Sequence, residues 1–180
     1  MKATAVATAL LVLAAAASAE ENKGPRSIYT DISDASCTVI PASGEPNEED
    51  GLKCRGPAGF NLLAQSGDLR ATVTIVGPDG KEYPLGFPDT VTGGFSSLGP
   101  RAEWRVRDAE SVPYAVIVRV SASENPDKPD EKTSWLAVAK ITAEAVCVTD
   151  KIKGGIDDNA RARAAADAAA SKPCLGGAKS

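Results

Sequence analysis

The chain has 180 residues, with 20 Lys and Arg against 24 Asp and Glu, a net charge of −4 and no histidine. A mildly acidic chain without a basic cluster does not attract phosphate backbones, so nucleic acid is not an expected partner. The lack of histidine excludes Ser-His-Asp and Cys-His nucleophile systems, His-ligated zinc, and acid–base catalysis by histidine.

Residues 1–19 have the organisation of a secretory signal peptide. Lys2 supplies a positive start, an apolar stretch covers residues 9–16, and Ala-Ser-Ala then offers small residues for cleavage. The apolar stretch is too short for a membrane-spanning helix, and no second one follows. We therefore expect a periplasmic or secreted protein with no membrane span, in which residues 20–180 form one domain.

The four cysteines are Cys37, Cys54, Cys147 and Cys174. In an exported chain an even number indicates disulfides, and four cysteines allow three connectivities. We favour Cys37–Cys54 and Cys147–Cys174, because each pair lies within one local segment. Closing each loop contributes about 3 kcal/mol in the chain-entropy model. A zinc site would need CxxC spacing or histidine, so no metal or cofactor is expected.

The first half of the domain is predicted to hold short strands between polar loops. Strands are expected at residues 27–32, 37–40, 60–64, 71–76 and 81–86. The turn Gly77-Pro78-Asp79-Gly80 should join the last two as a hairpin, because Pro presets φ and Gly accepts positive φ. Segments 41–53 and 87–100 are rich in Gly, Ser, Pro and polar residues and are predicted as loops. In the second loop, Phe95 and Leu98 are expected to turn inward.

The second half contains the strongest strand pattern, at residues 114–120. Tyr114 is expected to share a core face with Val116, Val118 and Val120, opposite Ala115, Ile117 and Arg119. This strand should pair with a second run at 135–141 across the polar loop 123–133. Further strands are expected at 102–107 and 143–148.

A helix is predicted from about residue 158 to 171, in an Ala-rich stretch. Asp157, Asp158 or Asn159 would cap its start, and Lys172-Pro173 would end it. Cys174 would then tie it back to Cys147, so that the helix forms a lid on the sheet.

The candidate binding surface lies on the strand at 102–107 and in the loop before it. Arg101, Glu103, Arg105 and Arg107 share one strand face. They form either an anion site or a solvated outer face, and a solvated face is the more ordinary arrangement for an antiparallel sheet. Phe95 adds an aromatic ring to this surface.

Other candidate sites have weaker patterns. The acidic segments 45–50 and 124–131 lack the spaced pattern of a calcium loop, so we interpret them as solvated loops. Segment 94–99 misses G-x-S-x-G by one residue, and no histidine is present to activate Ser96 or Ser97. Trp104 and Trp135 would form a sugar-stacking platform if exposed, but their alternating apolar surroundings favour the core.

Three parts of the chain resemble a group of uncharacterised secreted bacterial proteins. They are residues 54–60 with 68–70, residues 95–105, and residues 147–150 with the Ala-rich stretch up to Leu175. The resemblance covers most of the mature chain and implies a bacterial, exported, periplasmic protein. It implies no activity and no catalytic residue.

The sequence therefore predicts a mainly β domain, an antiparallel sandwich or small open barrel with one C-terminal helix tied by a disulfide; α+β is the alternative class. The predicted function is a non-enzymatic periplasmic binding or protein-interaction module, whose partner is a periplasmic protein or small ligand. The loops at 41–53, 87–100 and 123–133 would carry recognition. Alternatives are a secreted inhibitor of a hydrolase of the protease or lysozyme type, and a carbohydrate-binding module.

Overall fold

The structure is a computed structural model that describes residues 24–44, 49–107 and 110–176. The segment predicted as a signal peptide, and most of the acidic segment 45–50, lie outside the described residues. The elements are β1 Arg26–Asp31, β2 Thr38–Ile40, β3 Gly51–Arg55, the 3₁₀ turn η1 Pro57–Gly59, β4 Asn61–Gly67, β5 Arg70–Val76, β6 Glu82–Pro84, α1 Phe87–Thr90, β7 Phe95–Val106, β8 Pro113–Ser123, β9 Lys132–Ile141, β10 Val146–Lys153, α2 Asp158–Asp167 and the 3₁₀ turn η2 Ala169–Ser171.

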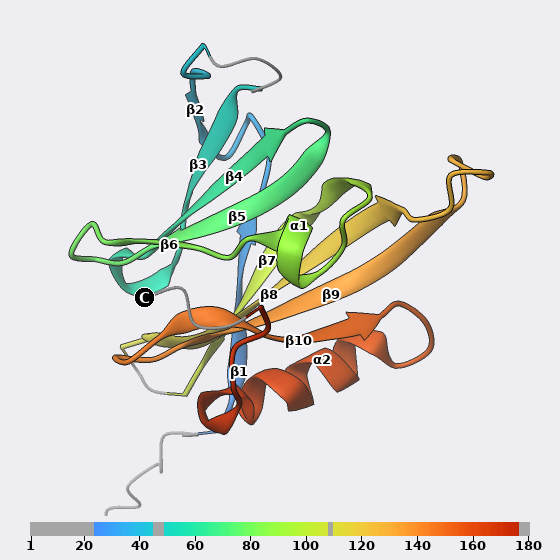
Figure 1. The fold of residues 1–180 in the computed structure, drawn as a ribbon. Coiled ribbons are helices and arrows are strands. Elements are labelled where there is room, and N and C mark those ends of the chain that lie inside the picture. The colour runs from blue at the N-terminus through green and yellow to red at the C-terminus, as the bar shows by residue number, and fades with distance from the viewer. Residues whose placement is uncertain (1–23, 45–48, 108–109, 177–180) are drawn as a thin grey trace, which may run out of the picture.

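The described strands form two five-stranded antiparallel sheets that pack face to face (Figure 1). The strand order is β1-β7-β8-β9-β10 in one, called here the long sheet, and β2-β3-β4-β5-β6 in the other, the short sheet. The mainly β fold, with one C-terminal helix and two disulfides, is confirmed. Of the two predicted architectures, the structure has the sandwich.

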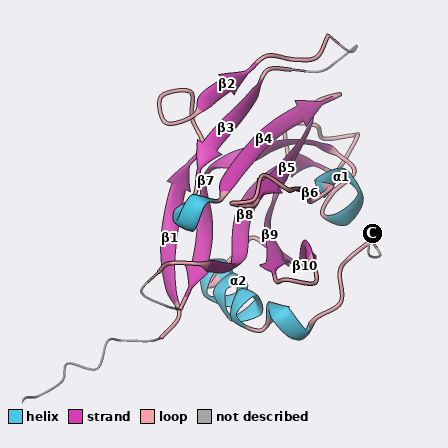
Figure 2. Cartoon of the chain, turned by 90° about the vertical axis from the view of Figure 1, so that its left-hand side faces the viewer, coloured by secondary structure: helices cyan, strands magenta, loops and turns pink. Residues whose placement is uncertain are grey.

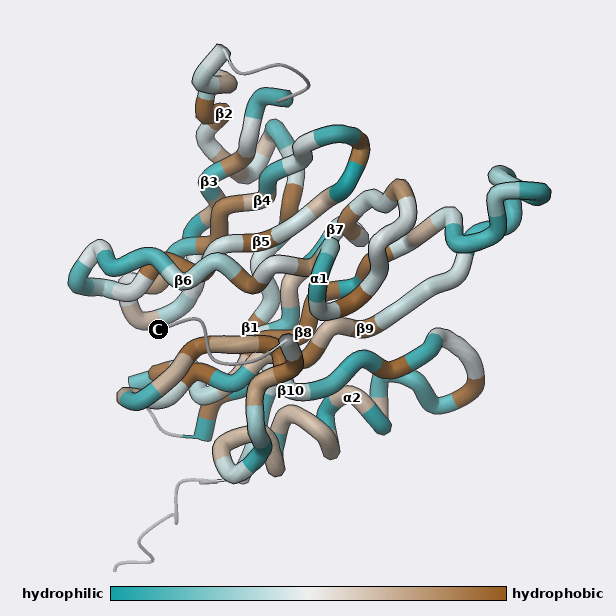
Figure 3. Tube along the Cα trace, viewed as in Figure 1, coloured by the Kyte–Doolittle hydropathy of each residue, from teal (hydrophilic) through white to brown (hydrophobic). Residues whose placement is uncertain are grey.

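The main core lies between the two sheets. The short sheet contributes Leu62, Val73 and Ile75, and the long sheet contributes residues such as Trp104 and Val116, all of them fully buried. Figure 3 shows the hydrophobic stretches on the facing strands and the hydrophilic tip of the β8–β9 loop projecting away from them. Burial of apolar area between the sheets is therefore the dominant stabilising term.

Helix α2 covers the other face of the long sheet (Figure 2). Ala162 and Ala166 are fully buried against Ala115, Ile117 and Val138. The small alanine side chains let the helix lie close to the sheet. Strand β8 is consequently buried on both faces, which explains its nearly continuous apolar run.

The predicted helix is confirmed, although its last turn is 3₁₀ and its cap is not the expected kind. Asp157 occupies the N-cap position with φ 59° and makes no side-chain capping bond. The Asp158 carboxylate instead accepts a hydrogen bond from Arg119 Nη1 at 3.0 Å. Asp158 thus makes a tertiary contact with the long sheet.

Both favoured disulfides are present. Cys37 is bonded to Cys54, and Cys147 to Cys174. Beyond the second bond, the Leu175 amide donates to the Val148 carbonyl at 2.7 Å and covers the outer edge of β10. Two disulfides are typical of proteins from an oxidising compartment. In the described ranges, no helix has the length and apolar content needed to cross a membrane.

The β8–β9 hairpin is confirmed, but Tyr114 does not lie on the predicted face. The register changes from Arg105 opposite Ala115 to Val106 opposite Pro113, so Tyr114 is the extra residue of a β-bulge. A bulge re-aims the side chain that it carries. Tyr114 therefore packs with the hydrophobic cluster between α2 and the long sheet, which includes Ala162 and Ala166, instead of with the inter-sheet core.

The prediction of one long loop at 87–100 was wrong. Strand β7 already begins at Phe95, and α1 occupies residues 87–90. Gly99 and Pro100 suggested a loop, but they lie at a second register shift, between Leu98 and Ala102, where a ladder tolerates Pro. Phe95 is 56% exposed, so it is not turned inward as predicted.

Candidate functional site

Strand β7 carries the residues of the predicted binding surface except Arg107, which directly follows it, but the structure divides them among different environments. Glu103 and Arg105 are buried, with 7% and 6% of their surface exposed, whereas Arg101 and Arg107 are exposed. The predicted solvated face was therefore wrong for its two central residues, because α2 lies over them. Phe95 lies at the opposite end of the strand, in a separate groove.

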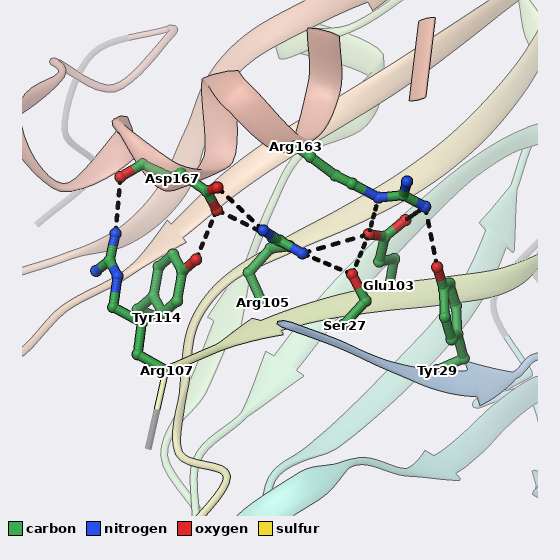
Figure 4. A network of polar contacts seen from close by, with 8 residues as sticks. All are labelled: Ser27, Tyr29, Glu103, Arg105, Arg107, Tyr114, Arg163 and Asp167. Carbon is green, nitrogen blue, oxygen red and sulfur yellow. Dashed lines mark hydrogen bonds and ion pairs between the residues drawn. The ribbon is translucent and has the colours of Figure 1, made fainter. Parts of the chain in front are cut away.

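A network of polar side chains joins β7 to the end of α2 (Figure 4). Arg105 donates two hydrogen bonds to the Asp167 carboxylate, from Nε at 2.9 Å and from Nη2 at 3.0 Å. The Tyr114 hydroxyl donates to the same carboxylate at 2.6 Å. Arg107 donates to the Asp167 backbone carbonyl at 3.0 Å and lies 3.9 Å over the Tyr114 ring. Asp167 is thus held by three side chains of the β7–β8 hairpin.

The second half of the network surrounds Glu103. Its carboxylate accepts hydrogen bonds from Arg163 of α2, from Nε at 2.6 Å and from Nη2 at 3.2 Å. Arg163 Nη2 also donates to the Tyr29 hydroxyl at 3.0 Å. Ser27 links the two halves, because its hydroxyl donates to Glu103 and accepts from Arg105 at 2.7 Å.

The electrostatics of the network keep the Asp167 carboxylate charged. Burial of the Asp167 carboxyl opposes ionisation, but hydrogen bonds from Arg105 and Tyr114 outweigh it and lower the pKa of Asp167. Burial and the hydrogen bond to Asp167 raise the pKa of Tyr114 to about 12. Every buried side-chain nitrogen and oxygen in the described ranges has a hydrogen-bond partner. The network therefore attaches the helix to the long sheet.

A groove of 450 Å³ lies at the opposite end of β7, here named the inter-sheet groove. It lies where β7, the β4–β5 turn and the start of β3 come together. Its walls combine apolar side chains with hydroxyls and a few charges. They comprise Ile32, Glu49, Asp50, Leu52, Ala64, Gln65, Ser66, Leu69, Ala71, Phe95, Ser96, Ser97, Leu98, Ser121 and Lys132.

Two exposed hydrophobic side chains line this groove. Leu69 is 58% exposed and Phe95 is 56% exposed. Leu69 belongs to the two-residue turn between β4 and β5, where Asp68 has φ 51° and Leu69 φ 56°. Such a turn favours Gly, Asn or Asp, and a branched residue with positive φ is strained. The chain therefore presents a leucine where both exposure and backbone conformation are unfavourable, a combination that is often found at functional sites.

The first part of β7 also has an incompletely paired edge. Residues Phe95 to Leu98 pair with β8 on one side, whereas β1 pairs with β7 only from Arg101 onward. On the side away from β8, the Ser96 amide donates to the Leu69 carbonyl at 2.9 Å, and the Ser96 hydroxyl accepts from the Ala71 amide at 3.1 Å. No strand of the described ranges pairs with this edge of Phe95–Leu98.

The charges around the groove are divided between its sides. Glu49 and Asp50 lie at the start of β3, and Asp50 accepts a hydrogen bond from the Ala42 amide at 3.0 Å. Lys132 lies on the side of β9 and donates to the Ser123 hydroxyl. The acidic side therefore has carboxylate oxygens available to a cationic group of a ligand.

Leu69→Gly is expected to raise the free energy of unfolding by about 0.5–1 kcal/mol. Left-handed backbone costs an L-residue about 1–2 kcal/mol, and the greater freedom of unfolded Gly offsets only part of that relief. Leu69→Ala keeps a Cβ at positive φ and serves as the matched control, with no gain expected. Urea unfolding monitored by circular dichroism measures both variants. A loss of stability in Leu69→Gly would show that the turn is not strained.

The two tryptophans do not form a shared exposed platform. Trp104 is fully buried in the core, as predicted, and its indole N–H donates to Thr30 at 2.9 Å. Trp135 is half-buried on β9, where its N–H donates to Glu124 at 3.0 Å and Lys151 lies 5.2 Å over its ring. Neither indole face is therefore open in the way that a sugar-stacking surface requires.

The described residues contain no group of three or more Cys, Asp or Glu side chains arranged to hold a metal ion. Asp68 and Arg70, on either side of Leu69, form a local ion pair. Leu69 was missed by sequence reasoning, because the turn Asp68-Leu69 lacks the glycine that usually marks a two-residue hairpin turn. In the sequence, the only indication of this turn is its position between the predicted strands at residues 60–64 and 71–76.

A comparison with protein-family models, curated proteins and solved structures finds no match, and the function is therefore inferred from the residues of the site.

Proposed function

We propose that the protein is a non-enzymatic interaction module that binds an extended peptide segment of a partner protein in the inter-sheet groove. The observation that carries this proposal is the coincidence of an incompletely paired strand edge with two exposed hydrophobic side chains. Residues Phe95–Leu98 have no strand partner on one side, and Phe95 and Leu69 line the groove there.

Peptide addition to a sheet edge uses both features. Main-chain hydrogen bonds to the edge supply affinity, and a pocket for alternate side chains supplies specificity. In this groove, the main chain of the peptide would continue the line of β1 along β7 as far as Leu98, because the Ser96 amide already donates to the Leu69 carbonyl. An apolar side chain of the peptide would then fill the space between Phe95 and Leu69.

The charge distribution favours a basic group beside that apolar side chain. Glu49 and Asp50 lie on one side of the groove, and the chain as a whole carries a net charge of −4. A cationic residue is therefore attracted, and an acidic one is disfavoured. The two tryptophans offer no open indole face on which a sugar could stack, so a glycan is the less favoured ligand.

The location of the partner is inferred from the predicted export signal. The proposed signal peptide at residues 1–19 and the resemblance to secreted bacterial proteins support a periplasmic or secreted module. The two disulfides agree with that compartment. The partner would then be another periplasmic or secreted protein with an exposed extended segment.

The proposal is tested by selecting peptides from a displayed random library on the mature protein and measuring their affinities by calorimetry. We expect selected peptides to combine an apolar residue with a nearby Lys or Arg. Phe95→Ala is expected to weaken their binding about tenfold or more, because aromatic anchors dominate such interfaces. Glu49→Gln should lower the affinity for the basic peptides by a smaller factor.

Val39→Ala provides the matched control. Val39 is 47% exposed on β2 and does not line the groove. Its substitution should leave the affinity unchanged. Selected peptides that bind Phe95→Ala as tightly as the wild type, or a library that yields no enriched peptide, would refute the proposal.

A further inference from the structure

A second cavity, of 360 Å³, lies beside α2 on the outer face of the long sheet. Three arginines line it: Arg101 from β7, Arg119 from β8 and Arg163 from α2. Its apolar lining residues are Pro100, which is exposed, and Ile117 and Leu136, which are exposed by only 4% and 3%. Three strongly basic side chains from three different elements thus meet over an apolar surface.

The arginines retain hydrogen-bond donors after their internal contacts are counted. An arginine has five N–H groups. In the contacts of the described residues, Arg101 uses Nε toward Asp31 at 2.9 Å, which leaves both Nη groups without a partner. Arg163 uses Nε and Nη2 toward Glu103 and Tyr29, which leaves its Nη1 group.

We propose that this cavity binds a small carboxylic acid, with its carboxylate on Arg101 and Arg163 and its apolar part against Pro100, Ile117 and Leu136. A guanidinium presents paired N–H donors that match the two oxygens of a carboxylate. The volume falls within the range of about 300–1,000 Å³ that small-molecule sites occupy. This site is separate from the inter-sheet groove and does not depend on the peptide proposal.

The charges around the cavity select a singly charged ligand. Each arginine already faces one carboxylate: Arg101 faces Asp31, Arg119 faces Asp158, and Arg163 faces Glu103. One additional negative charge can share the spare donors. Polyphosphates would bring several charges close to these three carboxylates, and the repulsion disfavours them. Free phosphate would leave the apolar lining uncovered.

Arg101 distinguishes ligand binding from a purely structural role. Arg119 and Arg163 fix α2 to the sheet through their ion pairs, so a structural reason for them exists. The side chain of Arg101 is 66% exposed, and its pair with Asp31 lies on the surface. Such exposed pairs contribute little to stability. Arg101→Gln should therefore leave the fold intact while it removes the most accessible donors.

The test titrates the ¹⁵N-labelled mature protein with benzoate and follows the backbone amides and the arginine Nε–Hε signals. We expect saturable shifts of the Arg101 and Arg163 signals, with a dissociation constant on the order of millimolar for so small a probe. Arg101→Gln should lower the affinity for benzoate about tenfold. Arg161→Gln, an exposed arginine of α2 outside the cavity, is the matched control and should not change the affinity.

Benzamide and inorganic phosphate separate the contribution of the negative charge from that of the apolar ring. Benzamide has the ring without the charge, and phosphate has the charge without the ring, so both should bind at least about tenfold more weakly than benzoate. Equal binding of benzoate and benzamide, phosphate binding as tight as benzoate, or unchanged benzoate affinity in Arg101→Gln would overturn the assignment.

Discussion

Asp167→Ala is expected to lower the free energy of unfolding by about 3–4 kcal/mol. Removing this carboxylate takes away the two-bonded partner of the buried Arg105 guanidinium and leaves it only the Ser27 hydroxyl and the Glu103 carboxylate, 4.0 Å away. A buried charge that loses its main partner costs about that much. Arg105 has only 7% of its side chain exposed, so water compensates little. The Tyr114 hydroxyl loses its acceptor at the same time. Urea unfolding of the purified variant measures the loss.

Two comparisons isolate the buried charge as the cause. The double variant Arg105→Leu with Asp167→Leu removes both charges and should be more stable than Asp167→Ala by about 1–2 kcal/mol. Asp31→Ala breaks the exposed pair with Arg101 and should cost less than about 1 kcal/mol. If Asp167→Ala costs no more than Asp31→Ala, the network does not hold the helix.

The same interaction should depend on pH in a defined direction. The pKa of Asp167 is lowered in the folded state, so its contribution is complete above the unfolded value of about 3.9. It is lost as the pH falls through the lower folded value, where the carboxyl becomes protonated. The difference in stability between wild type and Asp167→Ala should therefore narrow below about pH 4.

Trp104→Ala is expected to cost about 3–5 kcal/mol, the usual cost of truncating a large buried aromatic residue. Its ring is fully buried against Phe60, with ring centres 6.3 Å apart. Its indole N–H donates to Thr30, whose hydroxyl in turn donates to the Arg55 carbonyl of the short sheet at 2.9 Å. The substitution therefore removes core volume and disturbs a hydrogen-bonded link between the sheets.

Trp135→Ala is the matched control. Trp135 is half-buried on β9, so its truncation should cost clearly less than that of Trp104. Both variants are measured by urea unfolding with circular dichroism detection, because fluorescence changes when a tryptophan is removed. Equal losses in the two variants would contradict the assignment of Trp104 to the inter-sheet core.

The strands and disulfides were predictable because their signals are local. Alternation at residues 114–120 and 135–141 indicated the central hairpin, and the turn Gly77–Gly80 indicated the β5–β6 hairpin. The cysteine pairs were found because each pair lies within one segment of the chain. Tyr114 was assigned to the wrong face because a β-bulge shifts the alternation by one residue, and strand periodicity alone does not reveal a bulge.

The burial of Glu103 and Arg105 could not be predicted from strand alternation. Their partners Arg163 and Asp167 are 60 and 62 residues away in the sequence, on a helix whose docking position the sequence does not state. Charged residues on one strand face indicate a solvated face unless a covering element is known. The groove was missed for a similar reason, since Phe95 and Leu69 meet only when the two sheets pack together.

The most direct test of the peptide-binding proposal is a crystal structure of the protein with a peptide selected on it. We predict that the peptide lies in the inter-sheet groove as an added strand that continues β1 along β7 as far as Leu98. One of its apolar side chains should lie between Phe95 and Leu69, with a basic residue near Glu49. A peptide bound on another surface, with the groove empty, would contradict this account.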